Sequence, residues 1–62
     1  MNNNVMILVV EDEKAIRNFM KISLTTQGYK VLESSNGNDA FALFMSYNPE
    51  LIVLDLGLHD ID

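Results

Sequence analysis

Short apolar runs alternate along the chain with longer segments in which apolar residues recur at helical spacing. Val5–Val10 and Leu51–Leu54 are apolar at every position, as expected of strands that are buried on both faces of a sheet. Tyr29–Ser34 is strand-like but mixes apolar with charged residues, which is typical of an edge strand. The pattern therefore predicts three strands, in which the two apolar strands are neighbours and the mixed strand lies outside them.

A helix is predicted over roughly Asp12 to Gln27, between the first and second strands. Glu11–Glu13 place acidic side chains near its start, where the helix dipole favours negative charge. Gly28 follows the helix and can adopt the left-handed conformation that ends many helices. The expected apolar stripe comprises Ala15, Ile16, Phe19, Met20 and Leu24, and the opposite side comprises Lys14, Arg17, Lys21 and Thr25.

A second helix is predicted between the second and third strands. Ser35–Asn38 has the chemistry of a turn, Asp39 is placed to act in the first helical turn, and Pro49 cannot continue a helix. The apolar stripe of this helix comprises Ala40, Phe41, Phe44 and Met45. We expect the phenylalanine and methionine side chains of both stripes to belong to the hydrophobic core rather than to a cofactor site.

The order strand, helix, strand, helix, strand predicts an α/β fold with parallel strands and right-handed crossovers. If the apolar strands are adjacent, the spatial order of the strands is 2-1-3. That order is the opening of a flavodoxin-like arrangement, whose ligand site lies where the strand order reverses, between the first and third strands.

Composition and charge exclude several classes of function. Nine acidic and four basic residues give a formal net charge of -5, which argues against contact with nucleic acid. The chain has no cysteine, so disulfides and thiolate metal sites are excluded. The longest apolar run, Val5–Val10, is far too short to span a membrane, and its flanks are not those of a signal peptide. We therefore expect a cytoplasmic protein of one small domain, with 62 residues and a marginal core.

Acidic residues follow both apolar strands at their carboxyl ends. Glu11 and Asp12 end the first strand, and Asp55 ends the third. Adjacent parallel strands would bring these ends roughly 5 Å apart. Converging carboxylates need a cation or protons to offset their repulsion, and all-oxygen ligands in an open crevice favour Mg²⁺ and phosphoryl transfer. The alternative interpretation is that these residues are merely solvated loop residues or helix caps.

Two segments resemble the acidic signatures of receiver domains from two-component signalling. They are Leu8–Glu13 and Leu51–Leu56, and their spacing, the Gly28 turn and the helix entry at Asn36–Gly37 also match. The resemblance covers the whole chain. Glu11–Arg17 and Leu54–Leu58 are most similar to regulators of potassium-uptake operons, the Kdp type.

The resemblance implies a role for each residue of the acidic cluster. Asp55 matches the phosphoacceptor, Asp12 the chief magnesium carboxylate and Glu11 its water-mediated companion. Gly57 matches the position whose backbone carbonyl completes the metal shell. The implied phosphodonor is a sensor histidine kinase, and the implied role is phosphorelay in transcription regulation, not enzymatic turnover.

The chain departs from the family pattern in two respects. His59 stands where the family usually carries a proline. Residues 1–62 correspond to a truncated receiver domain, so we expect the C-terminal half, with its Ser/Thr and Lys that bind phosphoryl oxygens, and the DNA-binding domain to be absent. The third strand would then be an open edge, and we expect a homodimer through it.

Two alternatives of other classes stay open. One is an inactive, self-associating half-domain. The other is a phosphatase-like enzyme with an aspartate nucleophile. Such enzymes carry a second aspartate two residues beyond the nucleophile, where this chain has Gly57, and this difference argues against the enzyme.

Overall fold

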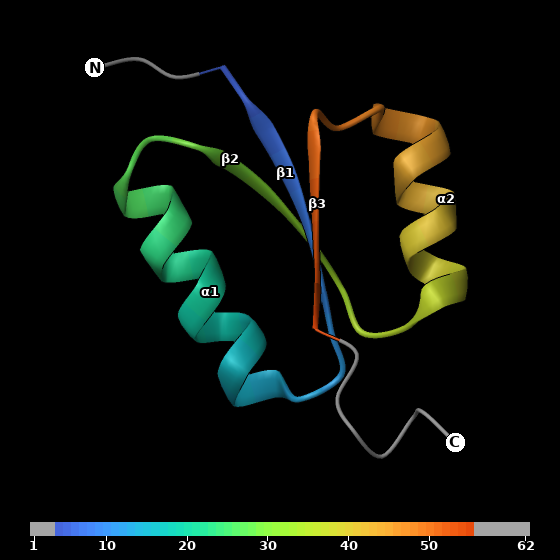
Figure 1. Cartoon of the computed structure of the whole chain (residues 1–62), viewed down its shortest axis with the longest axis horizontal. Coiled ribbons are helices and arrows are strands. Elements are labelled where there is room, and N and C mark those ends of the chain that lie inside the picture. The colour runs from blue at the N-terminus through green and yellow to red at the C-terminus, as the bar shows by residue number, and fades with distance from the viewer. Residues whose placement is uncertain (1–3, 56–62) are drawn as a thin grey trace.

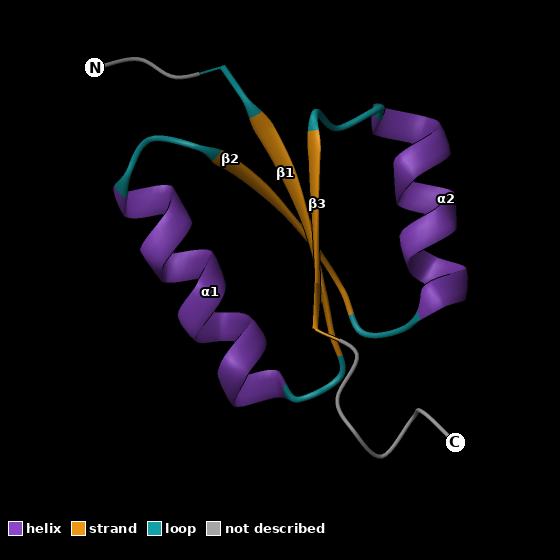
Figure 2. Ribbon diagram, in the orientation of Figure 1, coloured by secondary structure: helices purple, strands orange, loops and turns teal. Residues whose placement is uncertain are grey.

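A computed structural model describes residues 4–55 of the chain, and within them three parallel strands alternate with two helices (Figure 1). The elements are β1 (Met6–Glu11), α1 (Lys14–Thr26), β2 (Lys30–Ser34), α2 (Gly37–Tyr47) and β3 (Leu51–Asp55). The strand order in the sheet is β2-β1-β3, as the pattern predicted. The two helices lie on opposite sides of the sheet (Figure 2). The fold is therefore the β-α-β-α-β part of a flavodoxin-like arrangement.

The core of the described region is β1. Its apolar run is covered by a strand on each side and by a helix on each face, so Leu8 and Val9 are fully buried. Ile7 is 2% exposed and Val10 is 8% exposed. The uninterrupted apolar sequence of this strand thus reflects burial on both faces.

The start of α1 differs from the prediction by two residues. Glu11 extends β1 and pairs in register with Asp55, so the helix begins at Lys14, with Glu13 as the N-cap. The predicted end is confirmed. Gly28 has a φ of 96°, and its N–H donates to the carbonyl of Thr25 at 3.0 Å. Such a left-handed residue closes the last turn and lets the chain reverse into β2.

Both ends of α2 follow the predicted chemistry. Asn36 caps the helix, because its side-chain oxygen accepts from the N–H of Asp39 at 2.8 Å. Asn48 adopts a left-handed conformation with a φ of 53° directly before Pro49, which cannot continue a helix. In the described part of the chain, neither helix is long and apolar enough to cross a membrane.

The prediction that the phenylalanine and methionine side chains of both helices belong to the core is wrong for most of these residues. Phe19 is 70% exposed, and Phe41 and Met45 are each 65% exposed. The reason is the small area of sheet that each helix covers. Both helices contact β1 and β2, and neither contacts β3. The remainder of each stripe has no described element packed over it.

The third strand is an edge of the described sheet, so the burial on both faces that its apolar sequence predicted is not found among the described residues. It pairs with β1 along one side, and Leu51, Ile52 and Leu54 are between 41% and 58% exposed. An open apolar groove of about 320 Å³ separates β3 from α2. Residues from β1, β3 and α2 line it: Leu8, Val10, Ile52, Leu54, Gly37, Ala40, Phe41 and Phe44.

Candidate functional site

The carboxyl ends of all three strands meet at one edge of the sheet. Val10 pairs with Ser34 of β2 and with Leu54 of β3, and Glu11 pairs with Asp55. Adjacent strands lie about 4.8 Å apart, so the backbones of Glu11 and Asp55 are neighbours. This pairing confirms that the two acidic segments converge at the point where the strand order reverses, as predicted.

Glu11 and Asp12 have opposite environments although they are consecutive. Glu11 is only 3% exposed, and its Oε2 accepts from the N–H of Glu13 at 2.8 Å. Asp12 is exposed. A buried carboxylate is costly unless it accepts hydrogen bonds, so the Glu13 amide helps to hold Glu11 inside the sheet edge. The turn therefore presents one buried and one exposed carboxylate beside the end of β3.

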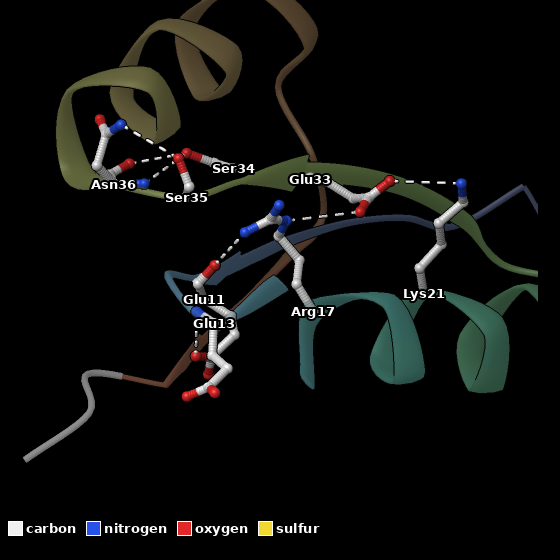
Figure 3. A network of polar contacts seen from close by, with 8 residues as sticks. All are labelled: Glu11, Glu13, Arg17, Lys21, Glu33, Ser34, Ser35 and Asn36. Atoms are coloured by element: carbon white, nitrogen blue, oxygen red, sulfur yellow. Dashed lines mark hydrogen bonds and ion pairs between the residues drawn. The ribbon is translucent and has the colours of Figure 1, made fainter. Parts of the chain in front are cut away.

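Arg17 connects this turn to β2 (Figure 3). Its Nη1 donates to the backbone carbonyl of Glu11 at 2.8 Å, and its Nε lies 3.7 Å from Oε1 of Glu33. Lys21 Nζ lies 3.5 Å from the other carboxylate oxygen of Glu33. The side chain of Arg17 is only 19% exposed, so its predicted place on the polar, outward side of α1 is wrong. Its spacing from Met20 and Leu24, three and seven residues, could have shown that all three share the inner face.

The end of β2 is fixed by a polar contact that the sequence reasoning treated only as turn chemistry. Ser34 is 4% exposed, and its hydroxyl donates to the carbonyl of Asn36 at 2.7 Å (Figure 3). The N–H of Asn36 donates back to the same hydroxyl at 3.3 Å. Asn36 also caps α2, so this pair ties the strand end to the following helix.

The predicted metal ligands are placed only in part. Glu11 and Asp12 lie in the described turn, and the backbone of Asp55 lies in β3. Gly57 and His59 lie outside the described residues. The side chains that the structure describes include no group of three or more His, Cys, Asp or Glu residues that could hold a metal ion. The predicted donors are all oxygen atoms, a chemistry that fits Mg²⁺.

The fold and the acidic sheet edge define an α/β protein of the flavodoxin-like class. Comparison with known families then identifies the chain within that class. Residues 7–62 match the response regulator receiver domain, and the chain belongs to this family. The resemblance recognised in the sequence is thereby confirmed.

The relatives are regulators of transcription. The chain is 43% identical over 56 residues to the transcriptional regulatory protein AfsQ1 of Streptomyces coelicolor, covering 90% of this chain and 25% of that protein. It is 41% identical over 61 residues to the probable transcriptional regulator ycf27 of Porphyra purpurea, covering 98% and 25%. The transcriptional regulatory protein KdpE of Mycobacterium tuberculosis is 38% identical over 56 residues, covering 90% and 25%. The relatives thus include a regulator of the predicted Kdp type, and the chain spans about a quarter of the length of each.

Proposed function

We propose that this chain is the phosphoacceptor receiver module of a two-component response regulator, with Asp55 as the acceptor. The observation that carries the proposal is the parallel pairing of Glu11 with Asp55 at the carboxyl edge of the sheet. It joins the acidic turn after β1 to the only carboxylate that ends β3. Membership of the receiver family supports the same assignment. The proposed phosphodonor is a phosphohistidine of a sensor histidine kinase.

The proposed reaction is a transfer between two side chains. A carboxylate oxygen of Asp55 forms a bond to phosphorus as the phosphorus–nitrogen bond of the phosphohistidine breaks. The electron pair of that bond returns to the imidazole ring, and an acyl phosphate remains on Asp55. The module is thus a stoichiometric acceptor and not an enzyme that acts on a free substrate.

The proposed cofactor is Mg²⁺, held by the carboxylates of Glu11, Asp12 and Asp55 and by the backbone carbonyl of Gly57. When bound, Mg²⁺ supplies positive charge that offsets the negative oxygens of the phosphoryl group. The buried side chain of Glu11 and the exposed side chain of Asp12 suit different tasks. Asp12 can reach a hydrated ion directly, whereas Glu11 would act from inside the edge, through water.

The proposal extends to the setting in which the module works. Residues 1–62 would form the first three strands and two helices of a receiver domain, within a regulator of transcription. Direct contact with DNA by this segment is disfavoured by its net charge of -5. We propose the cytoplasm as the setting of the module, because a regulator of transcription works in the compartment that holds the DNA.

Labelling with a small phosphodonor tests the acceptor. We expect acetyl phosphate and magnesium to add one phosphoryl group to the chain, and mass spectrometry to map that group to Asp55. The variant Asp55→Asn should lose the label, because an amide is not a competent nucleophile at this position. Asp39→Asn is the matched control, since Asp39 is an aspartate in the first turn of α2. A label on another residue of the parent chain, with Asp55 free, would exclude the assignment.

Magnesium affinity tests the ligand set. We expect Asp12→Asn to weaken Mg²⁺ binding by more than the roughly tenfold that loss of an outer-shell partner costs, because a direct anionic ligand is removed. Asp39→Asn should bind as the parent does. The measurement is a magnesium titration followed by NMR chemical shifts. Equal affinities in the parent and in Asp12→Asn would remove Asp12 from the site.

We also propose a second copy of this chain as a partner, joined through β3. The free side of β3 carries unpaired backbone groups within the described sheet, and its side chains are apolar and largely exposed. Residues 51–54 include no charge and no proline that would protect such an edge from pairing. Antiparallel pairing of two β3 strands about a two-fold axis would join both sheets into one.

A further inference from the structure

We propose that Arg17 is a positioning residue for the magnesium site, holding the turn that carries Glu11 and Asp12 in the geometry that the ion requires. This inference rests on the proposed function, because it concerns the same acidic turn. Arg17 is not itself a ligand, since a guanidinium has no lone pair to offer and repels a cation. Its effect is exerted through the backbone on either side of Asp12.

Two contacts from one residue span the turn. The Nη1 of Arg17 donates to the carbonyl of Glu11 at 2.8 Å, and its backbone N–H donates to the carbonyl of Glu13 at 2.9 Å. These carbonyls lie on the two sides of Asp12. A third hydrogen bond, from the Glu13 N–H to Oε2 of Glu11, closes the turn from within. Asp12 therefore projects from a backbone that is tied at both ends.

The guanidinium is itself anchored from a second strand. Oε1 of Glu33 on β2 lies 3.7 Å from Nε of Arg17, and the Arg17 side chain is 19% exposed (Figure 3). The planar guanidinium can serve the carbonyl and the carboxylate at once from different nitrogen atoms. A lysine ammonium at the end of a flexible chain lacks this fixed fork, so Arg17→Lys keeps the charge and loses the double contact.

Lys21 provides the contrast within the same network. Its Nζ lies 3.5 Å from Oε2 of Glu33, yet no contact of Lys21 with the acidic turn is among those that the structure records. Replacement of Lys21 removes one positive charge from α1, as replacement of Arg17 by glutamine does. It leaves the contact between Arg17 and the Glu11 carbonyl in place. If magnesium affinity depended only on net charge, or only on an ion pair with Glu33, Lys21→Gln should therefore change it as well.

A positioning role for Arg17 and a purely electrostatic role predict opposite changes in magnesium affinity when Arg17 is replaced by glutamine. Mg²⁺ demands near-ideal octahedral geometry, so a turn that samples several conformations binds it more weakly. On Coulomb grounds alone, removal of a positive charge would instead strengthen cation binding. The direction of the change in affinity thus separates the two roles.

The test is a magnesium titration of the 62-residue chain and its variants, followed by NMR, with amide hydrogen exchange of Glu13 measured in the absence of metal. We expect Arg17→Lys and Arg17→Gln both to bind Mg²⁺ roughly tenfold more weakly, as outer-shell substitutions commonly do. Both should also exchange the Glu13 amide faster than the parent. Lys21→Gln should match the parent in both measurements.

The contrary outcomes are distinct. Parent-like or tighter magnesium binding by both Arg17 variants overturns the inference. Weakening in Arg17→Gln with parent-like binding in Arg17→Lys also overturns it, because the double contact of the guanidinium would then not be needed. If Arg17→Gln fails to fold by circular dichroism, Arg17→Lys and Glu33→Gln decide instead, and both should bind Mg²⁺ more weakly than the parent. Glu33→Gln removes the charge that pairs with both Arg17 and Lys21, and Lys21→Gln controls for loss of the Lys21 pair. A parent chain that binds no magnesium overturns the proposed function. In that case, faster exchange of the Glu13 amide in the Arg17 variants would still show that Arg17 holds the turn in place. Unchanged exchange would show that it does not.

Discussion

Replacement of Ile7 by alanine is expected to destabilise this chain by about 2 to 5 kcal/mol. Ile7 is 2% exposed in the central strand, between Val31 of β2 and Leu51 of β3. Truncation of a buried isoleucine to alanine costs about 2 to 5 kcal/mol, because apolar contacts are lost and a cavity remains. A domain of this size has a free energy of unfolding of only about 3 to 9 kcal/mol in total. The substitution therefore consumes much or all of the stability.

A second isoleucine provides the matched control. Ile22 lies in α1 and is 54% exposed, and alanine is favourable within a helix. Ile22→Ala should change the free energy of unfolding by less than about 0.5 kcal/mol, as surface substitutions usually do. Urea titrations followed by circular dichroism, at one fixed protein concentration, compare the two variants with the parent. Equal destabilisation by both changes would contradict the assignment of β1 as the core.

The sheet could be predicted because its signals are local and strong. The uninterrupted apolar run Val5–Val10 requires cover on both faces, which only a central strand receives. Gly28 and Asn36 mark helix ends through conformations and hydrogen bonds that few other residues provide, and both occur where the structure has a helix boundary. Parallel crossovers then leave few possible strand orders, and the observed order β2-β1-β3 is the predicted one.

The packing of the helices could not be predicted in the same way. Helical periodicity shows which residues share a face, but it does not show how much sheet lies beneath that face. In α1 the stripe is broader than the area over β1 and β2, so Phe19 is exposed while Arg17 points inward. An arginine is normally assigned to solvent, and only the backbone carbonyl of Glu11 and the carboxylate of Glu33 explain its place.

The candidate site could likewise be predicted only in part. The sequence placed Glu11 near Asp55, because both follow apolar strands that a parallel sheet brings together, and the register bears this out. It did not predict that Glu11 would be buried and would accept from the Glu13 amide. That contact is possible because the helix begins at Lys14 and not at Asp12. Local hydrogen bonds of this kind set a helix boundary to within one or two residues.

The variant Ile52→Lys is expected to convert a dimer of this chain into a monomer. Ile52 lies within β3, is 41% exposed, and lines the apolar groove beside α2. In an antiparallel pair of β3 strands about a two-fold axis, each copy would bring a lysine to the same short interface. Charges on an edge strand oppose pairing, because their desolvation and mutual repulsion are not offset there. We expect the dissociation constant to rise by at least about tenfold, which corresponds to about 1.4 kcal/mol.

Sedimentation equilibrium over a dilution series measures this change, and Ile22→Lys is its control. That variant adds the same charge in place of the same residue type, at a site on α1 with 54% exposure and away from the strand edge. It should retain the parent dissociation constant, because net charge alone alters association weakly at physiological salt. Equal weakening by both variants would show that charge, and not the β3 edge, governs association. A parent chain that stays a folded, cooperative monomer at micromolar concentration would exclude the dimer itself, since the exposed strand would then be tolerated in water without a partner.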